Sequence, residues 1–510
     1  MVFFRKYNAS EGSESRYGTN QGRISAKLEE NTAEIQAIFC DTPDLVVREL
    51  VIRQTSNKAA LVYLSGITDS KVVFDHILDP LLFQGEKEKK EGDIKVSLGH
   101  IKEAATWKQV ESAILSGECV LFLDNHKEAY IYDTPAFPKR SLEDSPIETY
   151  LSGAHVGFTE TGGDNIALIR QQIPNRELKI KEMTVGERGK TKLSILYLAD
   201  VADQEILKEL VDRIQRVNVD SVINAGVLSQ YIEDHSYSPF PQFLLTERPD
   251  FAATEILQGR FVTVVDRSPS VIVGPASFNN FFTTVDDYSN RWMVASFVRL
   301  LRYIGFFIAI FLPAIYIATI SFHFEVIPLK LLFSIGESRE RIPFPPFIEA
   351  FIMELTLEML REAGIRLPAK IGQTVGIVGG IVIGQAAVEA GIVSNIMVIV
   401  VALTAIASFI IPNYEMGSAI RIVRFPMMIL ASLFGFVGII VGLMILLSHF
   451  IGLESLGMPY GSPVAPLRFP DWKDLFIRFP QWSLEKRPFS TNAIQMKRAN
   501  PRQPKGDEEQ

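Results

Sequence analysis

Residues Tyr303–Phe324 read YIGFFIAIFLPAIYIATISFHF, and this run contains one ionisable side chain besides tyrosine, a histidine. No charged residue occurs in Ile392–Ile411 or in Phe425–Ser448. Because about 20 apolar residues let a helix cross the hydrocarbon core of a bilayer, each run predicts a membrane span. Residues Gly372–Gly391 have a similar length with one acid and predict a fourth. The alternative, four buried helices of a soluble fold, is the weaker interpretation.

The composition of the whole chain excludes several classes of function. The 510 residues include 51 Lys and Arg against 59 Asp and Glu, a formal charge of −8. Since phosphate contacts need a basic excess, we expect no nucleic-acid partner. Two cysteines cannot build a disulfide framework, and the seven histidines show no metal-ligand spacing. We therefore expect neither a metal nor another cofactor.

No motif in the sequence indicates an enzyme. Residues Thr184–Thr191 (TVGERGKT) contain Gly-Lys-Thr, but a phosphate-binding loop needs a further glycine five positions before Gly189. That position is Thr184. A nucleophile-elbow sequence is also absent, so no catalytic residue is assigned.

Composition divides the chain into five parts. Residues 1–45 begin with a stretch rich in Ser, Glu, Gly and Asn and are expected to be disordered. We expect two α/β subdomains, at residues 46–149 and 150–290. We expect an all-α polytopic membrane domain of four to six segments at residues 291–484. Residues 485–510 are polar and predict a flexible tail. The expected fold class is an α/β cytosolic region followed by an all-α membrane domain.

Hydrophobic periodicity predicts the main elements of the two α/β subdomains. In the first, we expect a strand, two helices and a hairpin, at Ala59–Ser65, Ser70–Phe83, Trp107–Leu115 and Cys119–Tyr132. In the second, we expect a strand, an amphipathic helix and a hairpin, at Leu193–Leu198, Gln204–Val217 and Phe261–Val273.

The distribution of basic residues predicts the orientation in the membrane. About 290 residues precede the first apolar run without a signal sequence, so the N-terminal region is expected in the cytosol. Arg299 and Arg302 flank that run on the cytosolic side, as the positive-inside bias requires. Arg421 and Arg424 do not fit this scheme. Four spans return the C-terminal tail to the cytosol, with basic residues beyond the last run at Arg468, Lys473 and Arg478.

Glycines recur every four residues in the fourth apolar run, at Gly372, Gly376, Gly380 and Gly384. On a helix they form one ridge without side chains, which permits close approach of another helix. Packing within one chain and packing between chains both remain open.

Two polar residues of the same run, Gln385 and Glu389, lie one turn apart and face away from the glycine ridge. A carboxylate facing lipid is costly, so Glu389 is expected to face water, a cation or a protein partner. The alternative is a carboxylate at the membrane surface, since Gly391 ends the run.

Residues Pro343–Pro346 (PFPP) predict the start of a helix that runs to about Ala363. Its edge carries acids at four-residue spacing with one arginine among them, at Glu354, Glu358, Arg361 and Glu362. An acidic rim beside a pore would attract cations. The alternative is a surface helix whose acids are solvated or paired with Arg361 and Arg366.

These segments carry a family resemblance. Phe344–Pro368 followed by Gly372–Glu389 resembles the hallmark of the A subunit of spore germinant receptors, the GerA family. Three shorter motifs extend the resemblance upstream, namely Tyr237–Gln242 (YSPFPQ), Thr246–Asp250 (TERPD) and Asp286–Trp292 (DDYSNRW). The resemblance covers roughly residues 45–480.

The resemblance implies a place and a role. Members sit in the spore inner membrane with a transporter-like B subunit, which binds the nutrient, and a C-subunit lipoprotein. The A subunit is expected to oligomerise as a pentamer into a cation channel that opens on germinant binding, with its α/β region as a cytosolic assembly module. Val382 and Gln385 would then lie near the constriction and Glu389 at a mouth.

Three other functions compete with the channel. A secondary transporter would use broken helices around Pro343–Pro346 and Pro412, although an inverted repeat is missing. A signalling scaffold would use the membrane part only as an anchor. A relative that amplifies ion release without sensing nutrients would share the same family.

Overall fold

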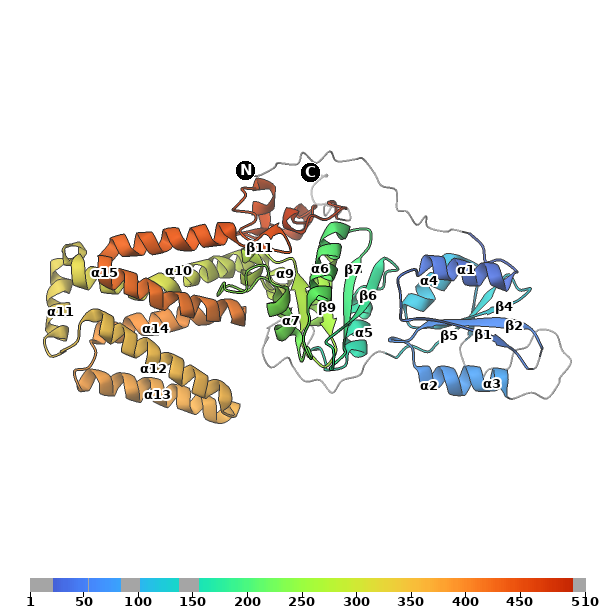
Figure 1. Cartoon of the computed structure of the whole chain (residues 1–510), viewed down its shortest axis with the longest axis horizontal. Coiled ribbons are helices and arrows are strands. Elements are labelled where there is room, and N and C mark those ends of the chain that lie inside the picture. The colour runs from blue at the N-terminus through green and yellow to red at the C-terminus, as the bar shows by residue number, and fades with distance from the viewer. Residues whose placement is uncertain (1–21, 54, 84–100, 137–155, 499–510) are drawn as a thin grey trace, which may run out of the picture.

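Two α/β subdomains and a bundle of long helices follow one another along the molecule (Figure 1). The computed structural model describes residues 22–53, 55–83, 101–136 and 156–498. The first subdomain lies at one end, the second in the middle and the helical bundle at the other end. The predicted fold class, two α/β subdomains followed by an all-α domain, is confirmed.

The first subdomain is a five-stranded antiparallel sheet in the order β1-β2-β4-β5-β3, with helices on both faces (Figure 1). Alternate residues of β2 enter different cores, so that Ala60 and Val62 face α1 and α4 while Ala59 and Leu61 face the other side. The strands are β1 Leu45–Val51, β2 Lys58–Leu64, β3 Ile101–Ala104, β4 Cys119–Leu123 and β5 Ala129–Tyr132. The helices are α1 Leu28–Ile38, α2 Ser70–Val72, α3 Asp79–Leu82 and α4 Trp107–Leu115. A π-helix, Val73–Leu78, connects α2 to α3.

The second subdomain repeats this plan in a sheet of order β6-β7-β9-β10-β8. Its strands are β6 Leu178–Val185, β7 Thr191–Leu198, β8 Leu244–Thr246, β9 Phe261–Val265 and β10 Val271–Gly274. Its helices are α5 Gly162–Gln172, α6 Gln204–Arg216, α7 Ala225–Ile232 and α8 Pro249–Leu257, and the short α9 Val285–Ser289 follows. The predicted amphipathic helix is confirmed as α6, whose apolar face is buried at Ile206, Leu207, Leu210, Val211 and Ile214.

The two subdomains have the same strand order and the same helix–strand junctions. In each, a nine-residue helix, α4 or α8, is followed by a glycine with positive φ and then by a central strand. These glycines are Gly117 (φ 84°) and Gly259 (φ 95°). A methyl group at Gly117 would lie 2.5 Å from the carbonyl oxygen of Ile67, so the turn requires glycine. The subdomains are therefore two copies of one fold.

A buried ion pair joins the two copies. Arg170 of α5 donates from Nε (2.6 Å) and Nη2 (2.9 Å) to the carboxylate of Asp44, just before β1. The guanidinium is almost fully enclosed. Because a two-pronged pair fixes orientation as well as distance, it sets the angle between the copies.

Among the described residues, α10 and α15 have the length and hydropathy of a membrane span, although α15 is interrupted at Gly435, and α14 is a shorter apolar helix. The predicted count of four to six segments stays a prediction. The helices are α10 Trp292–Phe322, α11 Leu329–Arg339, α12 Pro346–Arg366, α13 Ala369–Glu389, α14 Asn395–Phe409 and α15 Tyr414–Gly452.

Helix α15 reverses direction at Gly435, whose φ of 59° and ψ of −137° are not helical. A methyl group at Gly438 would overlap the carbonyl of Leu430, and one at Gly442 would overlap the side chain of Met427. Residues on either side of the break are therefore packed against each other, and Figure 1 shows the two arms side by side. The prediction that residues 425–448 form one span was wrong, because glycine allowed the chain to fold back within an apolar run.

Two boundary predictions were also wrong for the described residues. Residues 1–45 were expected to be disordered, but α1 buries Leu28, Ile35 and Ile38 against the first sheet. Residues 485–510 were expected to be a flexible tail, but Ala493 is buried and the Ile494 amide donates to the carbonyl of Val201. In both segments widely spaced apolar residues meet a partner distant in sequence.

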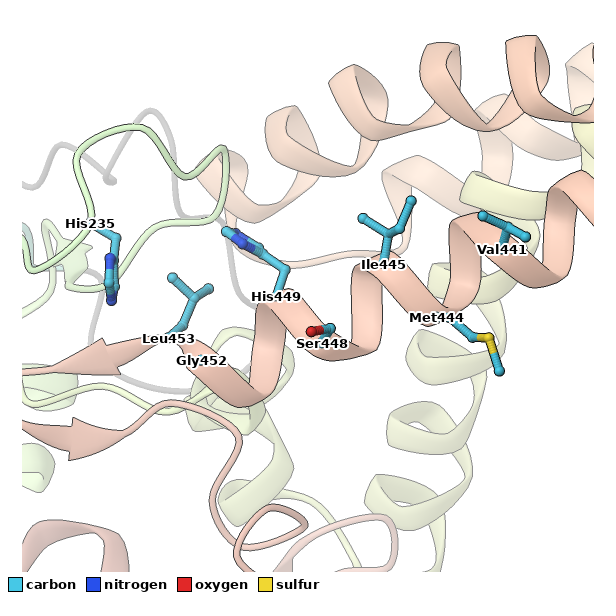
Figure 2. A pocket seen from close by; sticks show the side chains of 8 residues that line it. All are labelled: His235, Val441, Met444, Ile445, Ser448, His449, Gly452 and Leu453. Carbon is cyan, nitrogen blue, oxygen red and sulfur yellow. The ribbon is translucent and has the colours of Figure 1, made fainter. Parts of the chain in front are cut away.

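The second subdomain and the helical domain share one core. Phe278 contacts Phe306 of α10 and Phe450 of α15, with ring centres 5.4 and 4.9 Å apart. Beside this contact a cavity of about 610 Å³ is lined by His235 of the second subdomain and by the end of α15 (Figure 2). The His449 ring lies 2.8 Å from the hydroxyl of Ser238. The junction between the second subdomain and the helices α10 and α15 is therefore packed and hydrogen-bonded.

We expect Gly435→Ala to destabilise the helical domain. The conformation is almost confined to glycine and costs about 1–3 kcal/mol in other residues, and the new methyl group would lie 3.1 Å from Cβ of Phe322. Thermal unfolding of the detergent-solubilised protein measures the loss. Gly452→Ala is the control, since nothing lies within 4 Å of the added group. Equal unfolding temperatures for both variants would contradict the reversal at Gly435.

Candidate functional site in the helical domain

Helices α12 and α13 form a hairpin along one side of the helical domain (Figure 1). Helix α12 begins at the predicted Pro346 but ends at Arg366, two residues beyond Gly364. A methyl group at Gly372 would lie 2.7 Å from the carbonyl oxygen of Gly364, so the close approach of α13 to the end of α12 requires glycine at position 372. The predicted helices are present, and the turn between them is tight.

The glycine ridge of α13 serves packing within the chain only in part. Gly372 is buried. A methyl group added at Gly384 would lie 3.8 Å from the side chain of Val398 on α14. Gly380 is exposed, with no atom within 4 Å of such a group. The surroundings of Gly376 lie outside the part of the chain that the structure describes. One stretch of the ridge therefore faces away from the chain's own helices.

The three candidate pore residues lie together on the exposed part of α13. Val382 is 57% exposed, and Gln385 and Glu389 are exposed as well. The amide nitrogen of Gln385 donates to Glu389 at 2.9 Å. An apolar side chain and a polar pair thus share a surface that the chain itself leaves open.

Arg424 is the centre of a contact between three helices. Its guanidinium is buried, pairs with the buried carboxylate of Glu354 on α12, and donates from Nε to the carbonyl of Ala309 on α10 at 2.7 Å. In a helix that carbonyl would accept from the residue four positions later, which is Pro313 and has no N–H. Arg424 therefore supplies the hydrogen bond that the proline removes.

The neighbouring charges extend this cluster. Glu358 lies 3.6 Å from Arg421 and 3.9 Å from Arg361. Arg361 also donates to the hydroxyl of Ser408 at 3.1 Å and lies over the ring of Phe409. Together with Glu354 and Arg424 the cluster holds two carboxylates and three guanidinium groups. We call these five residues the arginine cluster.

The acidic edge of α12 is therefore neutralised within the chain. Glu354 and Glu358 belong to the arginine cluster, and Glu362 pairs with Arg366 at 2.6 Å on the surface. The alternative is met in part: Glu362 pairs with Arg366 and Glu358 lies near Arg361, but the buried Glu354 pairs with Arg424, which the alternative did not include. The hypothesis of a cation-attracting rim stays untested for an assembly, but the single chain leaves no excess of negative charge there.

A second buried pair fixes the start of α12. Arg339 of α11 lies 2.9 Å from Glu349, whose other oxygen accepts from the amide of Ser394 at 3.0 Å. The Ser394 hydroxyl in turn lies 3.2 Å from that of Tyr316 on α10. Four segments therefore meet at one carboxylate.

Sequence reasoning named Arg361 and Arg366 as partners of these acids but missed Arg339, Arg421 and Arg424. The only signal was that Arg421 and Arg424 did not fit the positive-inside pattern; their burial beside Glu358 and Glu354 accounts for it. Among the described residues, no group of three His, Cys, Asp or Glu side chains is placed to hold a metal ion. The ion pairs of the site hold α10, α12 and α15 together and leave one face of α13 exposed.

Comparisons with known proteins agree with this architecture. Residues 33–490 match the family profile described as Bacillus/Clostridium GerA spore germination protein. Spore germination protein KA of Bacillus subtilis (strain 168) is 39% identical over 476 residues, covering 92% of this chain and 87% of the relative. The uncharacterized membrane protein YfkQ of the same organism is 40% identical over 474 residues, covering 92% of each. Spore germination protein GerLA of Bacillus cereus is 39% identical over 472 residues, covering 91% and 96%.

One solved structure also aligns. The crystal structure of the N-terminal domain of the A subunit of the Bacillus megaterium spore germinant receptor GerK3 matches with 26% identity and a TM-score of 0.39. The alignment covers 50% of this chain and 98% of that one.

The architecture and the family match define a membrane protein with a large duplicated α/β region. The chain belongs to the GerA family of spore germination proteins, as the A subunit of a germinant receptor. Such subunits are parts of receptor complexes and are not enzymes. The family resemblance in the sequence is thus confirmed.

We expect Glu354→Gln to destabilise the protein strongly. It leaves Arg424 charged and unpaired in the interior, and breaking a buried pair costs about 3–5 kcal/mol. Glu362→Gln is the matched control, since exposed pairs contribute about 0–1 kcal/mol. Denaturation in detergent compares the two variants. Similar losses for both would show that Glu354 is not enclosed.

The role of Pro313 makes a separate prediction. Replacing Arg424 by Met removes the donor to Ala309, and Pro313→Ala restores a backbone donor. Pro313→Ala should therefore stabilise the Arg424→Met protein more than it stabilises the wild type, by about 1–3 kcal/mol, the cost of an unsatisfied buried group. A double-mutant cycle of unfolding free energies measures this difference. Additive effects would contradict the shared carbonyl.

Proposed function

We propose that several copies of this chain surround a pore in the spore inner membrane and form a germinant-gated cation channel. The copies would number five, as the family resemblance suggests. The observation that carries the proposal is the exposed surface of α13, where Val382, Gln385 and Glu389 have no cover from the chain itself.

The chemistry of that surface favours a pore over contact with lipid. A carboxylate and an amide on a membrane helix are costly in hydrocarbon, and such groups usually face water or protein. The uncovered Gly380 lies on the same helix and permits close approach of a neighbouring copy. Channels commonly combine an apolar constriction with a ring of charge. Val382 and Gln385 would form the constriction, and Glu389 the charged mouth.

The arginine cluster supports this arrangement by fixing α12. Glu354 and Glu358 attach one face of α12 to α10 and α15, so α13 is held on its outer side. A pore helix must keep its position while ions pass. A rigid α12 is the support that this requires.

The partners and the orientation form part of the proposal. A transporter-like B subunit would bind the nutrient, and a C-subunit lipoprotein would complete the receptor. The α/β region would lie in the cytosol as the assembly module. In support, the segment after α15 contacts the start of α10, so both lie at the α/β end of the helical domain.

Potassium flux from liposomes tests the channel. The purified protein is reconstituted alone and with its B and C subunits, and flux is measured with and without germinant. We expect Val382→Ala to raise the basal flux severalfold, since a smaller side chain weakens an apolar gate. Ile399→Ala on α14 is the control, because that residue is equally exposed at 57%.

Two outcomes would contradict the proposal. The first is the absence of flux from any preparation that retains its partner subunits and binds germinant. The second is equal flux from the wild type, Val382→Ala and Gln385→Ala, which would remove these residues from the pore.

A further inference from the structure

The segment after α15 exposes a row of large apolar side chains. Within residues 467–482 seven of them are between 38% and 69% exposed, namely Leu467, Phe469, Trp472, Phe476, Ile477, Phe479 and Trp482. We call residues 467–482 the C-terminal collar. Contiguous apolar patches of this kind are rare on surfaces that face water, and they mark contact with a partner or a membrane.

The collar is held in place by its remaining side chains. Asp474 accepts from Arg299 and from the hydroxyl of Tyr288, both at 2.7 Å. Arg478 is buried and donates to the carbonyls of Asp287 (2.7 Å) and Asn290 (3.0 Å). The side chains of Asp474 and Arg478 thus turn toward the protein, while the large apolar side chains are exposed.

The Tyr288 hydroxyl, which donates to Asp474, keeps its proton at neutral pH. Burial and the neighbouring Asp474 carboxylate raise the pKa of Tyr288 above its usual range, so the phenol stays a donor. The Asp287 carboxylate also bridges Arg299 (3.3 Å) and Arg302 (2.8 Å) of α10. The collar is therefore attached to the first three turns of α10.

This attachment sets the level of the collar relative to a bilayer. The apolar run of α10 starts at Tyr303, one turn after Arg299, which binds Asp474 of the collar. The 31 residues of α10 extend about 46 Å, which exceeds the roughly 30 Å hydrocarbon core. Its first turns, which expose Trp292 and Phe297, consequently lie at the membrane surface.

The composition of the collar matches that surface. Tryptophan and other aromatic rings concentrate where hydrocarbon meets headgroups. Lys473 is exposed beside Trp472 and offers a charge to anionic headgroups. The acids of the collar are engaged, Asp474 as above and Asp471 with the amide of Phe489 at 3.0 Å.

We propose that the C-terminal collar lies in the headgroup region of the bilayer and inserts its aromatic side chains between lipids. The occupant of this surface is lipid, because the collar packs against the start of α10, through the rings of Phe476 and Tyr303 and the contact of Ser296 with Arg478, at the level where the membrane begins. The collar fixes the depth of α10 and, through Asp287 and Asp474, the position of the second subdomain on the membrane.

Tryptophan fluorescence tests the proposal on the full-length chain. The protein has four tryptophans, and three versions keep only Trp472, Trp482 or Trp107, with the others replaced by Phe. Each is reconstituted in phosphatidylglycerol–phosphatidylethanolamine vesicles with acyl chains brominated either near the headgroup or near the chain end. Trp107 is 4% exposed in the first subdomain and serves as the control.

We expect the Trp472 and Trp482 versions to lose about half of their emission to shallow bromine and less to deep bromine, as interfacial rings do. Trp107 should lose none, and iodide in the buffer should quench Trp472 and Trp482 little. A version that retains only Trp292 verifies insertion of α10.

Two results would overturn the proposal. Strong iodide quenching of Trp472 and Trp482 without bromine quenching would place the collar in water. No quenching by either agent would show that a second copy or a partner subunit covers it. Because the readout needs no ion flux, failure of the channel proposal would leave this test valid.

Discussion

The helical domain depends on one guanidinium group. Arg424 meets the carboxylate of Glu354 and the Ala309 carbonyl that Pro313 leaves without a donor. An unpaired charge or an orphan carbonyl is costly away from water, so removing Arg424 would leave both Glu354 and the Ala309 carbonyl unsatisfied. Three helices, α10, α12 and α15, are thereby held in one arrangement, and α13 is carried outside it.

The same physical rule operates at the other end of α10. Arg299 and Arg302 converge on Asp287 of α9, and Arg299 also binds Asp474 beyond α15. Basic residues at the start of a span are usually counted for orientation alone. Here they also join the second α/β subdomain, the first span and the C-terminal segment.

Local patterns were read correctly where a helix or strand depends on its own sequence. The amphipathic pattern of Gln204–Val217 and the hairpin of Cys119–Tyr132 were both predicted. Features that depend on distant partners were missed. The pair between Glu354 and Arg424 joins positions far apart in the chain, and Gly435 looks like any glycine of an apolar run until its φ is known. The roles of Val382, Gln385 and Glu389 need neighbouring copies, so they stay predictions.

The duplicated α/β region has a mechanical consequence. Its first copy lies farthest from the membrane helices and is joined to the second by the Arg170–Asp44 pair (Figure 1). The two copies and the helical domain thus follow one another in a line, with the second copy between the other two. A force applied to the outer copy would therefore reach the membrane helices through the inner copy.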